Sequence, residues 1–594
     1  MINKIISKSK INVHSMIRHG SVAVITLFIV GMLFGVKNVM LVFPIALTSA
    51  VMGRQNFHVK TMSKSLRIIA LDVIIVIVAH VSSLNLYFGI PINLISIFLI
   101  MYTIVSPYDL TFYKPFLMLF IFTQYAAVPT SELYLRIMAV ILGIGIVILA
   151  SIVKKANEKS ILGNSLTGVL RDINLQLENI LNGSYDKKLQ EKCSRSMRDL
   201  AYKIYVTRYK EYLTTNLGKI QFRIFISSEY LNLCLAEVNT KFERGILHRK
   251  DISELIGVIE NILEYKEGKV QFDVIKKRLQ AYRTLNLNKV RGNGYDHDYI
   301  DASSMNLFNA LGNLTEAIGE LNDLGYKEIN KVYNQWERTD IDRPRVVFKE
   351  YFDTNSIRFK FALRMALTMT IALFIGERLG YYKVIWAIIT IMSIMQPYYE
   401  DTKSKVKDRV IGNILAIVIT GVIVNLANSQ WVTIGILVIS LYLLYGFKEY
   451  YKISLFAGMA SMCIASLNQN INVLIFYRVL YVIIGVIAVI IINKYVFPYR
   501  LKDGIDAIVK KILRLRVQLI NAAKEVDKNK FKEHEIRDLV IHSTLLSQKL
   551  YLRNLQCNYD EINDFIDKNN RVVIGIAYNT LRYSEVKRKE NKTE

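Results

Sequence analysis

The stretch WAIITIMSIMQPYYEDTKSKVKDRVIGNILAIVITGVIV, residues 386–424, decides how the whole chain folds. Two apolar runs flank a strip that holds a proline, two tyrosines and a series of charged residues. A bilayer core of about 30 Å needs apolar segments of about 17–25 residues. The pattern therefore predicts two membrane spans, near 382–396 and 408–426, joined by a charged cytoplasmic loop.

Apolar runs of the same kind cluster in two blocks of the chain, and we expect six spans in each. In the first block they lie near 20–35, 38–53, 66–82, 88–105, 113–128 and 132–153. In the second they lie near 361–376, 382–396, 408–426, 430–446, 452–468 and 472–495. Several are short for a full crossing, so half-spans and tilted pairs remain open.

The segments between and after the blocks are polar, with apolar residues at three- and four-residue spacing, which is typical of amphipathic helices. The predicted fold class is all-α. We expect a polytopic membrane protein with two duplicated six-helix transmembrane blocks, each followed by a helical cytoplasmic domain. The predicted segments are a cytoplasmic N-terminus (1–19), transmembrane block 1 (20–153), a cytoplasmic helical domain (154–357), transmembrane block 2 (358–497) and a C-terminal cytoplasmic helical domain (498–594).

The duplication is predicted from an internal repeat. Sliding the chain by 345 residues aligns Gly31 with Gly376. A slide of 342 then aligns Arg67 with Arg409 and Arg136 with Arg478. The change of register falls after the second span, in a polar strip where insertions cost little.

The net charge of +26 does not indicate a nucleic-acid partner, because the excess flanks the apolar blocks and the polar middle is nearly balanced. Lysines and arginines gather instead on alternate loops and flanks. The positive-inside rule then predicts that the N-terminus, the C-terminus and both polar domains lie in the cytoplasm. We expect a multi-pass protein of the plasma or inner membrane.

Enzyme chemistry has no support in the sequence. There is no P-loop, nucleophile elbow or zinc-protease motif, and the cysteines lack metal-binding spacing. Asp296, His297 and Asp298 are adjacent, but neighbours on an extended chain point to opposite sides, so we interpret them as part of a solvated linker. The prediction is a non-enzyme with no cofactor and no metal.

Paired arginines are candidates for substrate contact. Arg67 and Arg409 begin the third span of each block, and Arg136 and Arg478 begin the sixth. A guanidinium is always charged and binds carboxylates through two hydrogen bonds. Two copies about a pseudo-two-fold axis could line an anion path. The alternative is that these arginines anchor span ends at the membrane boundary.

Asp72 is the one carboxylate within the third span of the first block. Ionisable groups at membrane depth are costly and often functional, so Asp72 is a candidate proton carrier for coupled transport. The alternative is a carboxylate near the inner boundary that pairs with Arg67 or with another helix. The repeat places Ile414 opposite Asp72, so the duplicated machinery does not require a carboxylate there.

The opening stretch resembles the signature of the fusaric acid resistance and aromatic acid exporter family, a W-A-x-x-T run followed by R-x-x-G-T-x-x-G. The matching residues are Trp386, Ala387, Thr390, Gln396, Pro397, Arg409 and Gly412. Asn413 stands in place of the threonine and Ala416 in place of the second glycine, and the first block has Leu41 in place of the tryptophan. A distant similarity to plant aluminium-activated malate channels is also present.

The resemblance implies a plasma-membrane exporter of aromatic carboxylates or related small organic anions, driven by a proton gradient or the membrane potential. It adds Trp386, Pro397 and Gly412 to the candidate site residues. A passive anion channel and a non-transporting scaffold with protein-binding cytoplasmic helices remain alternatives. The expected partners are the substrate anion and the lipid bilayer, with a homo-oligomer or an unidentified protein partner left open.

Overall fold

A computed structural model of the chain describes residues 11–52, 61–104, 112–152, 158–207, 213, 215–292, 302–324, 354, 356–378, 380, 383–427, 429–467, 469–526 and 531–593. Regular structure within these residues is helical, and no strand occurs among them. The expectation of an all-α chain is confirmed for this described part. Asp296, His297 and Asp298 lie outside the described residues.

The chain divides into two compact units, and each is assembled from two separate segments. The membrane unit comprises residues 1–155 and 340–504, and the polar unit comprises 156–339 and 505–594. Each unit is described below by itself.

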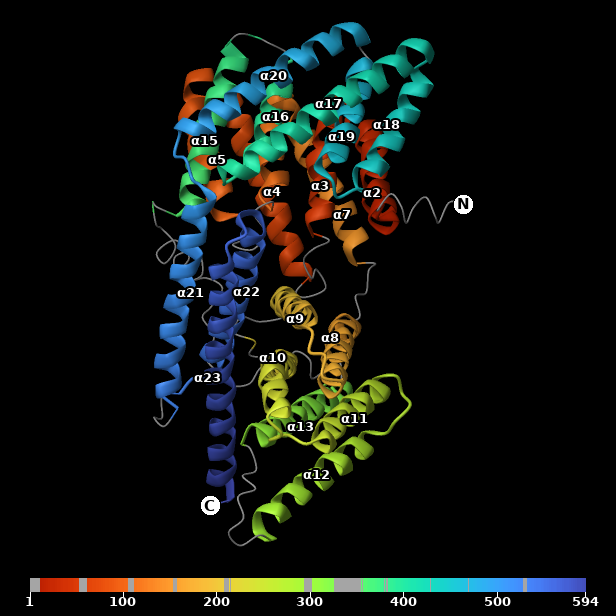
Figure 1. Ribbon diagram of the computed structural model, residues 1–594. Coiled ribbons are helices and arrows are strands. Elements are labelled where there is room, and N and C mark those ends of the chain that lie inside the picture. The colour runs from red at the N-terminus through yellow and green to blue at the C-terminus, as the bar shows by residue number, and fades with distance from the viewer. Residues whose placement is uncertain are drawn as a thin grey trace. The chain divides into compact units, whose positions relative to one another are not determined.

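Within the described residues, the membrane unit holds two sets of six α-helices, shown in Figure 1. The first set is α2 (Val13–Phe34), α3 (Val42–Met52), α4 (Thr61–Ser83), α5 (Leu86–Thr103), α6 (Lys114–Tyr125) and α7 (Leu133–Ile152). The second set is α15 (Ile357–Arg378), α16 (Ile385–Ile394), α17 (Tyr399–Ala427), α18 (Gln430–Leu444), α19 (Tyr450–Ser466) and α20 (Ile471–Tyr495). Short 3-10 helices at Val36–Leu41 (η1) and Thr130–Glu132 (η2) precede α3 and α7.

Seven helices of the described residues are long and apolar enough to cross a membrane. They are α2, α4, α5 and a segment Thr130–Ser151 in the first set, and α15, α17 and α20 in the second. The second helix of each set is shorter: α3 has 11 residues and α16 has 10. The protein is therefore a multi-pass membrane protein that combines full-length candidate spans with shorter apolar helices.

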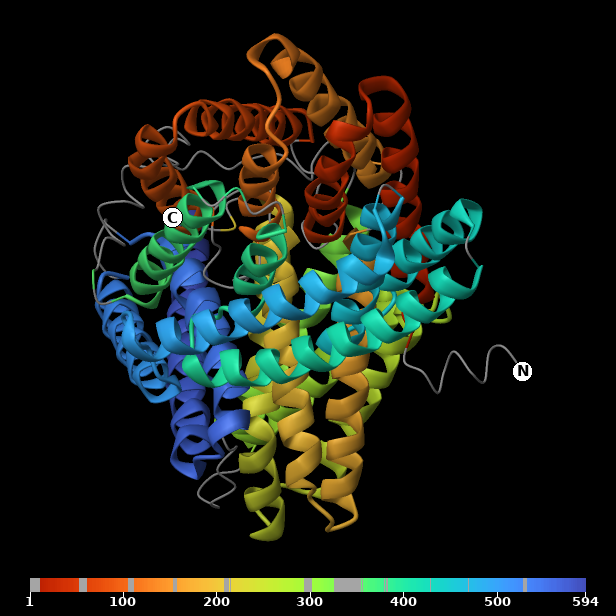
Figure 2. The same ribbon diagram turned by 90° about the horizontal axis from the view of Figure 1, so that it is seen from above.

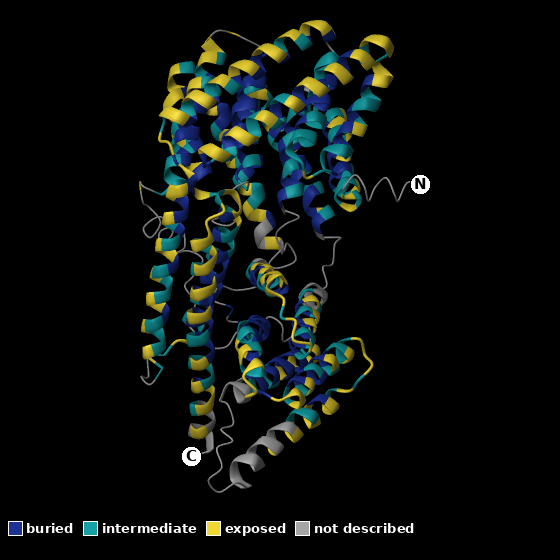
Figure 3. Ribbon diagram, viewed as in Figure 1, coloured by how far each residue is buried: buried dark blue, intermediate teal, exposed yellow. Residues whose placement is uncertain are grey.

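The outer surface of the membrane unit is apolar. On α20, the side chains of Ile483, Ile487 and Ile491 are exposed, while Arg478 and Asn493 face inward and are buried. Figure 3 shows exposed residues along the outer sides of α17 and α20. An extended apolar surface is unfavourable in water and favourable in lipid. Buried polar residues such as Arg478 and Asn493 therefore lie inside the helix packing.

The two sets share three internal packing contacts. In each set the third helix packs on the fifth and the sixth, and the second helix packs on the sixth. Figure 2 shows the long third and sixth helices of the second set, α17 and α20, running side by side. The hydrophobic core of the unit is continuous through both sets.

Contacts between the two sets are reciprocal: α2 packs on α18, and α5 packs on α15. The first helix of one set thus meets the fourth helix of the other. The Ser21 hydroxyl lies 3.1 Å from the Tyr442 hydroxyl in one contact. The Phe98 and Phe359 rings lie 5.5 Å apart in the other. Two copies related by a two-fold axis produce this kind of self-complementary pairing.

The charged strip after Pro397 is not a loop. It forms the first turns of α17, which begins at Tyr399 and continues without interruption through the apolar run. The strip has no glycine or proline before Gly412, and Glu400 and Asp401 occupy the first turn, where carboxylates stabilise the positive end of the helix dipole. The expected cytoplasmic loop at this position was therefore wrong, since helix-favouring residues extend the span into the polar region.

The polar unit is a bundle of amphipathic helices. It contains α8 (Glu158–Leu181), α9 (Lys187–Thr207), α10 (Asn216–Glu243), α11 (Arg249–Lys266), α12 (Phe272–Gly292), α13 (Ala302–Asp323), α22 (Glu533–Cys557), α23 (Asp560–Thr593) and all of α21 (Leu501–Lys524) except its first turn. The core helix α10 packs on α8, α9, α13 and α23. Helices from both segments of the chain therefore share one core.

Candidate functional site

Trp386 lies at the start of α16 and is buried among the apolar core residues of the second helix set. Two cations approach its ring: the Lys383 Nζ atom lies 5.4 Å from the ring centroid, and the Arg478 Cζ atom lies 5.2 Å from it. Cation–π contacts are stronger when both groups are removed from water. The Trp386 indole therefore contacts two cationic side chains inside the membrane unit.

Arg478 enters this cluster from α20, with only 3% of the residue exposed. Its Nε atom donates to Asn413 Oδ1 at 3.1 Å, and its Nη1 atom donates to Ser461 Oγ at 3.0 Å. Both partners are neutral. The hydrogen bonds fix the position of the guanidinium but leave its charge uncompensated.

Arg409 lies on α17, one turn before Asn413, and 5% of it is exposed. Its Nε atom is buried without a hydrogen-bond partner in the described residues. Asn413 donates from Nδ2 to the Arg409 backbone oxygen at 2.8 Å, while its Oδ1 atom accepts from Arg478. Asn413 therefore connects the two arginines, whose charges are close enough to repel each other.

The described residues supply no carboxylate partner to either guanidinium. Burying a charge without a counter-charge is expensive, and a buried cation normally pairs with an anion. Arg478 lies beside the indole and is linked through Asn413 to Arg409, so Trp386, Arg409, Asn413 and Arg478 form a group called the arginine cluster below. An anion that entered it would offset the electrostatic cost.

Gly412 permits the close packing behind this cluster. A Cβ atom at this position would overlap the Tyr451 backbone oxygen and would lie 2.7 Å from the Ser454 Cβ atom. Both residues belong to α19, so α17 and α19 can approach this closely only with glycine at position 412. The role of Gly412 in the structure is packing.

Pro397 lies at the other end of α16, where the chain turns into α17. Its backbone oxygen accepts a hydrogen bond from Arg364 Nη2 at 3.0 Å, and the Gln396 backbone oxygen accepts one from the same atom at 2.7 Å. Arg364 is almost fully buried and belongs to α15. This arginine fixes the connection that orients the start of α17.

In the first helix set, the arginine that aligns with Arg478 is Arg136, and its surroundings differ. Arg136 on α7 is fully buried, and it donates from Nε to Asn38 Oδ1 at 3.1 Å and from Nη1 to the Thr123 backbone oxygen at 3.0 Å. The repeat aligns Asn38 with Lys383 and Leu41 with Trp386. The first set therefore has an amide and a leucine where the second has a cation and an indole.

The buried faces of α7 and α20 agree under the 342-residue slide. Arg136, Ala139, Val140, Gly143, Val147 and Ser151 align with Arg478, Tyr481, Val482, Gly485, Val489 and Asn493, and all of these are buried. The third helices agree better with a slide of 341, which aligns buried Asp72, Ile75, Ala79 and His80 with buried Asn413, Ala416, Thr420 and Gly421. Asp72 thus occupies the place of Asn413.

Arg67 and Asp72 are placed differently from each other on α4. Arg67 is exposed, whereas Asp72 is buried with 2% exposed, and its Oδ2 atom has no hydrogen-bond partner in the described residues. The structure brings Trp386, Arg409 and Arg478 together, with Gly412 packing behind them. It does not bring Arg67, Arg136, Asp72 or Pro397 into that cluster.

Sequence reasoning missed three contributors. Lys383 and Ser461 were not among the candidate site residues, and Asn413 entered only as a departure from a motif. The available signal was the spacing of Arg409 and Asn413, because residues four apart lie on one face of a helix.

Comparison with known proteins identifies the second helix set. Residues 371–492 match the family model described as fusaric acid resistance protein-like. A search of curated proteins and of solved structures found no match.

Proposed function

We propose that this chain, whose residues 371–492 form a fusaric acid resistance protein-like domain, is a membrane transporter that exports small organic anions such as aromatic carboxylic acids. The observation that carries the proposal is the pair of buried guanidiniums: among the described residues, Arg478 donates its printed hydrogen bonds to neutral groups, and Arg409 Nε has no hydrogen-bond partner. The substrate anion supplies the missing negative charge during its passage.

The chemistry of the cluster favours a carboxylate with an apolar body. Arginine presents several N–H donors in a plane and binds carboxylate oxygens in pairs. Trp386 lies against Arg478, and Met462 and Tyr481 lie on the same helices as Ser461 and Arg478; all three belong to the hydrophobic core. A fully hydrophilic anion would lose its hydration next to these apolar residues, whereas the ring of an aromatic acid would pack against them.

Two sources of energy are compatible with this site. The membrane potential expels anions from a negatively charged cytoplasm, at about 2.3 kcal/mol per charge per 100 mV. A proton gradient would need a carrier, and Asp72 is a buried carboxylate whose Oδ2 atom lacks a partner in the described residues. We propose Asp72 as that carrier.

The proposal is tested by flux of radiolabelled benzoate in proteoliposomes. We expect the wild type to transport benzoate and Arg478→Gln to reduce the initial rate at least about tenfold, the cost of losing one charge-assisted contact. Arg67→Gln removes an arginine from an exposed position and is the matched control, with a rate near that of the wild type. Flux of the wild type no greater than in empty liposomes would support the scaffold alternative.

The energy source is tested with the Asp72→Asn variant in the same liposomes. We expect a proton gradient to accelerate the wild type and to leave Asp72→Asn unaffected, while benzoate exchange without a gradient persists in both. If the gradient accelerates both proteins equally, Asp72 is not the carrier. If it accelerates neither, the membrane potential alone drives the anion, as in a channel.

A further inference from the structure

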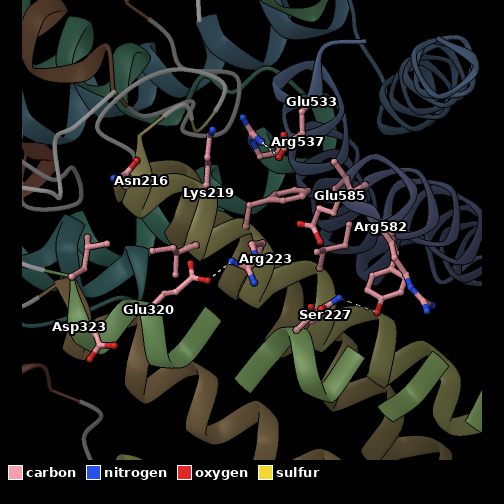
Figure 4. Close-up of a pocket in the computed structure, with 17 residues that line it drawn as sticks. Asn216, Lys219, Arg223, Ser227, Glu320, Asp323, Glu533, Arg537, Arg582 and Glu585 are labelled. Carbon is pink, nitrogen blue, oxygen red and sulfur yellow. Dashed lines mark hydrogen bonds and ion pairs between the residues drawn. The ribbon is translucent and has the colours of Figure 1, made fainter. Parts of the chain in front are cut away.

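The polar unit contains a cavity of about 520 Å³ between α10, α13, α22 and α23, shown in Figure 4. Ligand pockets in proteins commonly have volumes of about 300–1,000 Å³. None of these four helices is among the candidate membrane spans. A ligand can therefore bind in this cavity without being transported. Such binding would be an activity additional to the proposed function.

One part of the cavity wall is apolar and firmly held. Phe222 and Tyr578 line it, and both residues are almost completely buried. The Tyr578 ring stacks on Tyr230 with 4.2 Å between centroids, and its hydroxyl accepts a hydrogen bond from Asn313 Nδ2 at 3.3 Å. These contacts fix the rings, so the wall is a preformed surface for an apolar or aromatic group.

The remaining lining carries both signs of charge in equal number. Its cations are Lys219, Arg223, Arg537 and Arg582, and its carboxylates are Glu320, Asp323, Glu533 and Glu585. Figure 4 shows them distributed around the cavity on all four helices. A simple anion would face the carboxylates and a simple cation would face the arginines, at an unfavourable energy in each case.

Arg223 is a cation of the lining that can bind a ligand carboxylate. It has two acidic neighbours on α13: Glu320 Oε1 lies 2.7 Å from its Nη1 atom, and Glu316 Oε2 lies 3.6 Å from its Nη2 atom. The side chain is 29% exposed, and a guanidinium has five N–H donors. Glu316 can therefore compensate Arg223 while Glu320 accepts hydrogen bonds from a ligand ammonium group.

We propose that this cavity binds a zwitterion with an apolar side chain, an α-amino acid of the aromatic class. Arg223 binds the ligand carboxylate, Glu320 binds its ammonium group, and the side chain packs against Phe222 and Tyr578. Arg537 is 1% exposed, and its Nη1 atom donates to Glu533 Oε1 at 2.6 Å, so this pair is part of the wall.

The experiment is titration calorimetry of the full-length protein in detergent. The three probes share a phenyl ring and differ in which charged groups they carry. L-Phenylalanine has both groups, 3-phenylpropanoate lacks the ammonium group, and 2-phenylethylamine lacks the carboxylate. We expect L-phenylalanine to bind at least about tenfold more tightly than either analogue. Equal or tighter binding of 3-phenylpropanoate, or no heat with L-phenylalanine, would overturn the proposal.

Variants locate the binding. Arg223→Gln and Glu320→Gln should each weaken L-phenylalanine binding about tenfold or more, because each removes one charge-assisted contact. Arg171→Gln is the matched control, since Arg171 forms a comparable ion pair with Glu267, at 3.3 Å, outside the cavity lining. Weakening by Arg171→Gln to the same degree, or unchanged binding in both cavity variants, would place the ligand elsewhere and contradict the proposal.

Discussion

Buried charged residues in this chain differ in whether an opposite charge lies near them. Glu229 in the polar unit is 2% exposed, and burial raises its pKa from 4.5 to about 7, although nearby Arg198 acts in the opposite direction. The folded state therefore favours the neutral carboxyl. Its stabilising contribution is complete below pH 4.5 and is lost as the pH rises through about 7.

The Glu229→Gln variant tests this behaviour. We expect wild-type α10, which carries Glu229, to lose on the order of 3 kcal/mol of opening free energy between pH 4.5 and pH 8, and the variant to lose much less. Amide hydrogen exchange of α10 in the full-length protein, corrected for the intrinsic rate at each pH, measures this difference. The same pH dependence in both proteins would show that Glu229 is not the titrating group.

At the residue scale, a sequence predicts which side chains are unusual but not the direction in which they point. Arg67 and Arg409 were equivalent by alignment, yet Arg67 is exposed and Arg409 is buried. A helix turns by about 100° per residue, so a register change of one residue moves a side chain to a different face. Arg136 and Arg478 are both buried, and the buried positions of their helices agree at one offset.

At the element scale, glycine determines how closely α17 and α19 pack. We expect Gly412→Ala to lower the stability of the protein by about 1–3 kcal/mol, because the added methyl group overlaps the backbone of α19. Thermal unfolding in detergent measures the effect. Gly435→Ala on α18 is the control: no atom lies within 4 Å of its added Cβ, so its melting temperature should not fall. A melting temperature unchanged in Gly412→Ala would contradict the packing role.

The charged strip at the start of α17 shows what hydropathy can and cannot predict. Apolar run length correctly located α15, α17 and α20 as long spans. The predicted span of α17 stops at the charged residues, although the helix continues through them. The two differ because membrane hydropathy and helix propensity are separate properties. The sequence left half-spans open, and α3 and α16 have 11 and 10 residues.

At the scale of the whole molecule, the reciprocal contacts of α2 with α18 and of α5 with α15 could not be predicted from the sequence. Apolar periodicity identifies a buried face but not its partner, and both sets have several apolar faces. The agreement of the buried residues of α7 and α20 supports the predicted duplication. We propose that the two sets are related by a pseudo-two-fold axis.

The orientation of the chain in the membrane remains a proposal, with both polar segments in the cytoplasm. It predicts that a membrane-impermeant maleimide labels Ser131→Cys, which precedes α7, in intact cells. Lys250→Cys on α11 should react only after lysis. Both positions are exposed. The half-buried Cys234 and Cys557 are replaced by serine to lower the background. Labelling of Lys250→Cys in intact cells would place the polar unit outside the cell and contradict the proposed orientation.

The central claim is that Arg409 and Arg478 bind the carboxylate of the transported anion. The most direct measurement is a structure of the protein with 4-bromobenzoate, in which the bromine scattering locates the ligand. We expect a carboxylate within hydrogen-bonding distance of both guanidiniums and a ring against the apolar residues around Trp386. Bromine found only outside the arginine cluster, with Arg409 and Arg478 unoccupied, would contradict it.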